Sequence, residues 1–181
     1  MLNHSVRWTA AAVLLAFGTL GGPVRAQSSS EPAVKAGFVY NFAKFTEWPP
    51  GALASTQISV CLLGADPLGA VQGLLEGRPL QGRSVTVRRN VRGDDLKSCT
   101  LVFVTDVDER RQADALRTLR GLPVLTVGDA DGFVDAGGMI GLLVADDRIQ
   151  FEVNLDAAQR AGLRINSQLL RLARTVKGHP L

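Results

Sequence analysis

Histidine is almost absent from this sequence of 181 residues: there are two, His4 and His179, one near each end. A catalytic triad or metal site that depends on histidine therefore has no imidazole within the body of the chain. The Gly-x-Ser-x-Gly motif of hydrolases, the Walker loop and the Gly-x-Gly-x-x-Gly dinucleotide fingerprint are absent as well. These absences exclude most familiar classes of enzyme.

Acidic pairs are present, but none has the pattern of a catalytic or calcium site. Residues 129–132, "DADG", resemble part of a calcium loop, yet its first and twelfth positions would fall on Val127 and Gly138. Asp94–Asp95 and Asp146–Asp147 are adjacent pairs in predicted turns, and neighbours on an extended chain point to opposite sides. We therefore predict no catalytic residue, no metal ligand, no cofactor and no enzymatic activity.

Long apolar runs are missing after the first 26 residues. Near the N-terminus a basic start precedes the run "WTAAAVLLAFGTL", and small residues lead to Ala26. The run is shorter than the roughly 20 residues that a membrane-spanning helix needs, and its surroundings are typical of a secretory signal peptide. We predict a signal peptide over residues 1–26, cleaved after Ala26, and a single exported domain over residues 27–181.

An excess of one charge is also lacking. The chain has 20 Lys and Arg against 17 Asp and Glu, and the predicted signal peptide removes Arg7 and Arg25 and no acid. The remaining 18 basic and 17 acidic residues give a formal charge of +1. The one basic cluster, residues 87–92, is interpreted as a solvated strand edge. Nucleic acid is therefore not an expected partner, and direct membrane insertion is not expected.

Cysteine is limited to Cys61 and Cys99. An even pair in an exported protein favours a disulfide, and two buried free thiols are the alternative. Because there is no Cys-x-x-Cys, a thiol oxidoreductase is not indicated.

Regular patterns do run along the chain. They predict, in order, a helix from Pro32 to Thr46–Glu47, a strand over 57–64, a helix over 66–76, a strand over 83–91, a strand over 98–106, a helix over 108–120 and a strand over 122–129. This alternation predicts an α/β fold: a compact sandwich with a mixed, largely parallel sheet flanked by helices.

The last third has a different pattern. A loop rich in Gly and Asp over 129–138 leads to a predicted hairpin over 139–156, with the turn at "ADDR". One or two helices are then expected, with Asn166 or Ser167 as a cap. Their apolar stripe is predicted to consist of Ile165, Leu169, Leu172 and Val176.

Two places could contact another molecule. The aromatic block "YNFAKFTEWPP" ends the first predicted helix, and its side chains either belong to the core or line a ligand pocket at Tyr40, Phe45 and Trp48. In "RIQFEVN", Glu152 alternates with Phe151 and Val153, so it faces away from the core and is either solvated or in contact with a partner.

Six stretches, in this order and spacing, carry a family resemblance: "YNFAKFTEWP", "VCLLG", "CTLVFV", "PVLTVGD", "GGMIGLLV" and "IQFEVNLDAAQRAGLRINSQLLRLA". Together they resemble the YfiR family of periplasmic proteins over nearly all of residues 27–181. The resemblance implies a compact α/β domain, often a homodimer, without catalytic activity. Its best understood member represses an inner-membrane diguanylate cyclase by binding the periplasmic sensor domain of that enzyme, which lowers cyclic di-GMP signalling and biofilm formation.

Particular residues carry over from the family. Cys61 and Cys99 fall at the positions of a family disulfide. Some members have a second pair near the start of the late hairpin, and residues 134–141 contain no cysteine here, which puts a redox switch of that kind in doubt. Ile140 and Glu152 lie in the part of the fold where we expect contact with a partner.

The leading prediction is a periplasmic regulator that binds and represses a membrane-bound diguanylate cyclase. The alternatives are an accessory to a membrane histidine kinase and a periplasmic small-ligand-binding protein that uses Tyr40, Phe45 and Trp48.

Overall fold

A computed structural model describes residues 31–53, 55–64 and 73–179. The predicted signal peptide lies outside these residues, and so does most of the helix predicted over 66–76. The described helices are α1 (Glu31–Lys44), η2 (Gly93–Ser98, a 3₁₀ helix), α2 (Glu109–Leu119), α3 (Leu155–Arg160) and α4 (Ser167–Leu170). The described strands are β1 (Thr46–Glu47), β2 (Gln57–Gly64), β3 (Pro79–Leu80), β4 (Arg83–Arg88), β5 (Leu101–Thr105), β6 (Leu125–Gly128), β7 (Ile140–Ala145), β8 (Arg148–Asn154), β9 (Arg164–Ile165) and β10 (Thr175–Lys177).

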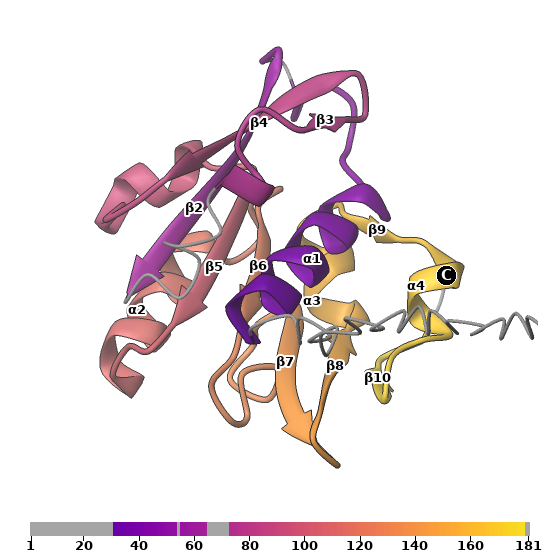
Figure 1. The fold of residues 1–181 in the computed structure, drawn as a ribbon. Helices are drawn as coiled ribbons and strands as arrows, with labels where there is room; N and C mark the ends of the chain where they lie inside the picture. Colours follow the sequence, from indigo (N-terminus) through magenta and orange to yellow (C-terminus); the bar gives the residue numbers. More distant parts are fainter. Residues whose placement is uncertain (1–30, 54, 65–72, 180–181) are drawn as a thin grey trace, which may run out of the picture.

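Eight of the strands form one sheet in the order β10-β8-β7-β6-β5-β2-β4-β3 (Figure 1). The central strands β4, β2, β5, β6 and β7 are parallel, while β8 is antiparallel to β7 and β3 is antiparallel to β4. The predicted fold class, a mixed and largely parallel sheet flanked by helices, is confirmed.

Each face of the sheet has its own apolar layer. Alternate residues of β2 separate the two layers, since Val60 and Leu62 pack toward α1 and Cys61 and Leu63 pack toward α2 and η2. This is the period of two that a strand buried on both faces requires. Figure 1 shows α1 crossing one face of the sheet.

The first helix ends earlier than predicted. It stops at Lys44, and Thr46–Glu47 form β1, which pairs with β9 in a two-stranded sheet. Thr46 donates a side-chain hydrogen bond of 2.7 Å to the carbonyl of Phe42, and the amide of Asn166 donates to the carbonyl of Phe45. These bonds satisfy carbonyls of the last helical turn, so the chain can leave the helix before Trp48.

Three details of the predicted helices are wrong. The spacing predicts Ala113 on the apolar face of α2, together with Leu116 and Leu119. Ala113 is exposed, because the buried face consists of Gln112, Ala115, Leu116 and Leu119. Leu172 is 74% exposed because α4 has only four residues, and Val176 belongs to β10. The amide of Arg174 donates to the carbonyl of Phe151, which aligns β10 with β8.

The late hairpin and its turn are confirmed. Strands β7 and β8 pair from Ile140 opposite Val153 to Ala145 opposite Arg148. Asp146 and Asp147 both have positive φ, 53° and 56°, as a two-residue hairpin turn requires. Of the residues of β7, only Ile140 and Gly141 pair with β6, so the rest of the hairpin extends beyond the end of β6.

Candidate functional site

The aromatic block lies where α1 meets the small β1–β9 sheet. Tyr40, Phe45 and Trp48 are half-buried and pack against the main core. The Tyr40 hydroxyl donates a 2.7 Å hydrogen bond to the carbonyl of Pro79, and the Arg78 guanidinium lies 4.2 Å from the centre of the Tyr40 ring. Tyr40 therefore joins α1 to the β3–β4 edge of the sheet.

Trp48 has one unusual feature. Its indole Nε1 is buried and has no hydrogen-bond acceptor among the residues that the structure describes. A buried donor left without a partner costs about 1–3 kcal/mol. Next to it, Pro49 packs on the turn before β9, where a Cβ on Gly162 would be in van der Waals contact with the proline ring at 3.4 Å. The block thus seats the end of α1 on that turn, and its role as a ligand pocket remains a prediction.

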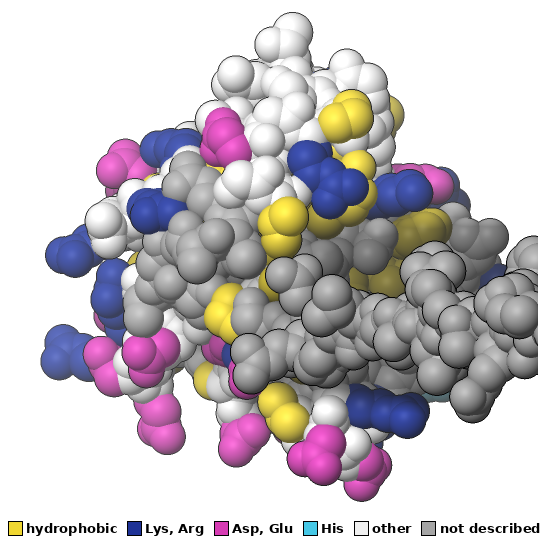
Figure 2. Space-filling view, viewed as in Figure 1, with side chains coloured by type: hydrophobic (Ala, Val, Ile, Leu, Met, Phe, Trp, Pro, Cys, Tyr) yellow, Lys and Arg dark blue, Asp and Glu magenta, His cyan; other side chains and the backbone are white. Residues whose placement is uncertain are grey.

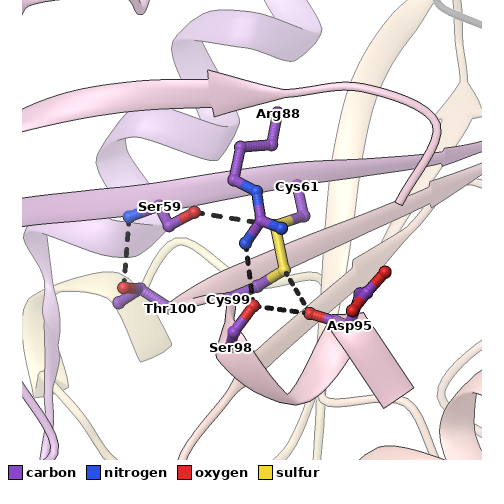
Figure 3. The surroundings of a disulfide bond; sticks show 7 residues. All are labelled: Ser59, Cys61, Arg88, Asp95, Ser98, Cys99 and Thr100. Atoms are coloured by element: carbon purple, nitrogen blue, oxygen red, sulfur yellow. Dashed lines mark hydrogen bonds between the residues drawn. A yellow bond between two sulfur atoms is a disulfide. The ribbon is translucent and has the colours of Figure 1, made fainter. Parts of the chain in front are cut away.

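The predicted disulfide between Cys61 and Cys99 is present in the structure. Cys61 is on β2, Cys99 follows η2, and the exposed fractions of the two residues are 0% and 5%. Figure 3 shows polar contacts around the bond: Arg88 donates to the Ser98 hydroxyl at 2.8 Å, and Ser98 donates to the carbonyl of Asp95 at 2.7 Å. The disulfide therefore fixes η2 on the α2 side of the sheet.

The two residues predicted to contact a partner differ in exposure. Ile140 is completely buried in the main core, because its strand position faces α1. A partner that binds the folded domain cannot reach this side chain, so its predicted role as a surface contact is wrong. Glu152 is partly exposed on β8, between Gly141 of β7 and Thr175 of β10, and its role remains a prediction.

A polar cluster at the carboxyl ends of β5 and β6 was missed by sequence reasoning. Lys35 of α1 bonds to Asp129, which follows β6, with 2.9 Å between Nζ and Oδ2. Thr105, the last residue of β5, donates to the same oxygen at 2.9 Å, and Glu31 lies 2.8 Å from Lys35. The side chains of Lys35 and Asp129 are only 13% and 12% exposed, whereas Glu31 is 57% exposed.

This cluster ties α1 to the edge of the sheet. Burial alone would lower the pKa of Lys35, but hydrogen bonds to Glu31 and Asp129 and the charges of both acids raise the pKa above the ordinary 10.5. The side chain is therefore a charged anchor. Its sequence signal is weak: Thr105 and Asp129 each end an apolar strand, and parallel strands bring such residues to one edge.

A shallow apolar groove of about 580 Å³ runs between α1 and the projecting hairpin. Its apolar lining comprises Val34, Phe38, Val144 and Ile149, and Val144 is 63% exposed. In Figure 2 the lower end of the molecule, where the hairpin projects, carries acidic side chains with a hydrophobic side chain between them. Over the left side basic and acidic side chains are interspersed (Figure 2).

Within ranges 31–53, 55–64 and 73–179, no group of three or more His, Cys, Asp or Glu side chains could hold a metal ion. Among the helices in those ranges, none has the length and apolar character that crossing a bilayer requires.

Comparison with known proteins identifies the family. A model of YfiR/HmsC-like proteins matches residues 32–174, from the first turn of α1 to the residue before β10. The chain belongs to the YfiR/HmsC-like family. This membership supports a role for the protein as a periplasmic regulator of a diguanylate cyclase system. The family resemblance predicted from the sequence is thereby confirmed.

The solved structures that are similar to this chain include a conserved domain protein from Vibrio cholerae O1 biovar El Tor. The two share 12% sequence identity with a TM-score of 0.44, and the match covers 66% of this chain. It spans 55% of the length of that chain.

Proposed function

We propose that this protein is a non-catalytic periplasmic repressor that binds the periplasmic sensor domain of an inner-membrane diguanylate cyclase. The family match over residues 32–174 carries the proposal, since it includes both core layers and the whole late hairpin. Repression would lower cyclic di-GMP and reduce biofilm formation. The protein is exported by the signal peptide of residues 1–26, and the regulator acts as a homodimer.

The contact surface that we propose is the β7–β8 hairpin. Val144 offers an exposed apolar side chain on the face of the hairpin toward α1, where Asp147 and Arg148 line the same groove. Glu152 offers a charge on the opposite face of the hairpin. Exposed apolar side chains next to charges are typical of protein interfaces.

A pull-down tests the partner. Tagged, exported protein would be incubated with solubilised inner membranes, with and without a thiol reductant. We expect recovery of one membrane protein that has a periplasmic sensor domain and a cyclase output domain. Recovery of a membrane histidine kinase instead would replace the cyclase with the alternative partner, and recovery of no membrane sensor would contradict the proposal.

Surface variants test the hairpin. Val144→Asp and Glu152→Lys should each reduce recovery of the cyclase and raise cyclic di-GMP in cells. Asp131→Lys is the matched control, because Asp131 is an exposed acid outside the hairpin. Equal loss with the control would show a general charge effect and reject the hairpin as the contact surface.

Trp48 Nε1, which has no hydrogen-bond acceptor in the described part of the chain, favours a second function. This function is binding of a small ligand with a hydrogen-bond acceptor at Tyr40, Phe45 and Trp48. Trp48 is the only tryptophan in residues 27–181, so its fluorescence reports on this place alone. We expect quenching or a spectral shift with an acceptor-bearing aromatic ligand such as an aromatic amino acid. An unchanged spectrum with the folded protein at millimolar ligand would reject this function.

A further inference from the structure

A cavity of about 330 Å³ lies on the α2 side of the molecule, apart from the surfaces described so far. It is formed by the end of α2, by β6, by the loop before β7 and by α3. The lining residues are Leu116, Leu119, Arg120, Gly121, Thr126, Ala136, Gly137, Met139, Ala157 and Arg160. It shares no lining residue with the apolar groove or with the aromatic block.

The charge of this cavity has one sign. Arg120 and Arg160 line it, and no acidic residue does. Both arginines are exposed, and neither has an ion-pair or hydrogen-bond partner for its guanidinium within the described part of the chain. Asp135, the chain neighbour of the lining residue Ala136, is paired with Lys177. A guanidinium is the side chain best suited to bind carboxylate or phosphate.

The arginines also have a favourable place in the fold. Arg120 follows the last residue of α2, and Arg160 is the last residue of α3. Positive charge is stabilising at the C-terminal end of a helix, so both arginines can remain charged and unpaired. The helix dipole explains why arginines are tolerated here, but it does not explain why two of them line one cavity.

The floor of the cavity combines apolar and polar groups. Leu116, Leu119, Met139 and Ala157 are buried apolar side chains. Thr126 is 2% exposed, and its hydroxyl oxygen accepts a 3.0 Å hydrogen bond from the amide of Met139. The hydroxyl hydrogen of Thr126 has no acceptor among the described residues. A bound ligand with an acceptor atom would satisfy it.

We propose that this cavity binds a small organic anion: a carboxylate or phosphate on a compact apolar body. Arg120 and Arg160 would hold the anionic group at the rim, and the apolar floor would take the body. The volume lies at the lower end of the range of about 300–1,000 Å³ that is usual for small-molecule sites. The site does not depend on the proposed repressor function, because binding here requires no membrane partner.

The test uses the purified exported protein and four probes: benzoate, phenyl phosphate, inorganic phosphate and the neutral benzyl alcohol. Binding would be followed by titration calorimetry and by shifts of the backbone amide signals of Gly121, Ala136 and Gly137. We expect benzoate or phenyl phosphate to bind with a dissociation constant of about 10 mM or tighter, the range for a probe of this size. Benzyl alcohol and inorganic phosphate should bind at least about tenfold more weakly. Benzyl alcohol lacks the anionic group, and inorganic phosphate lacks the apolar body.

Comparing the two aromatic anions distinguishes a carboxylate site from a phosphate site. Equal binding of benzyl alcohol would overturn the proposal, since the arginines would then contribute nothing. Equal binding of inorganic phosphate would leave only a nonspecific charge effect and would overturn it too. Absence of amide shifts with both aromatic anions would also reject the site.

Variants locate the binding. Arg120→Gln and Arg160→Gln should each weaken binding of the better aromatic anion about tenfold. Ala136→Leu should block the cavity from an exposed position with little effect on folding. Arg110→Gln is the matched control, because Arg110 is exposed on the same helix and does not line the cavity. The proposal is overturned if Arg110→Gln weakens binding as much as the two lining variants.

Discussion

At the scale of single residues, the Lys35–Asp129 pair is a polar contact that joins distant parts of the chain. The two residues are 94 positions apart, and both side chains are mostly buried. Asp129 also accepts from Thr105, so its carboxylate holds together α1 and the ends of β5 and β6. A charge held in this way is costly to leave alone, because its partner cannot be replaced fully by water.

Replacing Asp129 by Ala should therefore lower the free energy of unfolding by about 1–3 kcal/mol, since it leaves Lys35 and Thr105 short of a partner. Glu31→Ala removes the other acid that contacts Lys35, but Glu31 is 57% exposed, so the loss should be within about 0.5 kcal/mol. Urea unfolding at neutral pH measures both. Equal effects of the two variants would contradict an anchoring role for Asp129.

The same contact has a defined dependence on pH. The pKa of Lys35 is raised in the folded protein, so its stabilisation is fully present below the unfolded pKa and is lost as pH rises through the folded pKa. The stability difference between the unaltered protein and Asp129→Ala should be constant between about pH 7 and pH 9 and should shrink above about pH 10.5. Urea midpoints at pH 7, 9 and 11 would check it, and a difference that already shrinks below pH 9 would argue against Lys35 as the cause.

Glycines around Phe133 are a second feature at this scale. A Cβ on Gly138 would lie 2.1 Å from the Phe133 ring, and the ring itself is buried. Gly138→Ala should therefore lower the melting temperature, with a cost of about 1–3 kcal/mol from overpacking. Gly37→Ala is the matched control, because nothing lies within 4 Å of its Cβ position in α1. There we expect a gain of about 0.5–1 kcal/mol from helix propensity. Stabilisation by both substitutions would mean that Phe133 moves freely.

At the scale of elements, the long apolar strands and the helix over 109–119 could be predicted from the sequence, and the shortest elements could not. The strands of the central sheet have continuous apolar runs that only a buried strand explains. By contrast, β1, β9 and β10 have two or three residues each, too few for a period. Val176 fits a helical stripe with Leu169 and Leu172, but pairing with β8 determines its conformation.

The candidate sites divide in the same way. The Cys61–Cys99 bond could be predicted because composition and compartment limit the pairing to one choice. The Lys35 cluster and the cavity at Arg120 and Arg160 could not, because their members are brought together only by the order of strands in the sheet. Burial of Ile140 was missed because the hairpin sequence does not say which of its two faces is covered.

The disulfide is the element-scale feature with the largest expected effect on stability. It closes a loop with a sequence separation of 38 residues. In the chain-entropy model, a loop of this size stabilises by roughly 4 kcal/mol. The double variant Cys61→Ala with Cys99→Ala should lose most of this while keeping its far-ultraviolet circular dichroism. Urea unfolding would measure the loss, and an unchanged midpoint would mean that the bond adds no stability.

At the scale of the whole molecule, one sheet separates two apolar layers. Trp48 packs against the α1 layer, whereas α2 belongs to the other layer. Because β2 and β5, at the centre of the sheet, each contribute alternate residues to both layers, neither layer can lose its packing while the other keeps its own.

The protein should therefore unfold in one cooperative transition. Urea curves from Trp48 fluorescence and from far-ultraviolet circular dichroism should have the same midpoint. Loss of helical signal at a lower urea concentration than the fluorescence change would indicate that the α2 layer opens independently.

Burial of the disulfide affects the timing of its chemistry as well as the stability of the fold. A thiol must reach a sulfur atom before exchange can begin, and Cys61 and Cys99 are 0% and 5% exposed. Reduction must then wait until η2 moves away from β2. In excess reductant, the rate at which free thiols appear would measure the rate of these openings. Any response of this protein to a reducing environment is delayed by that interval, and a brief reducing pulse in the periplasm would pass without effect.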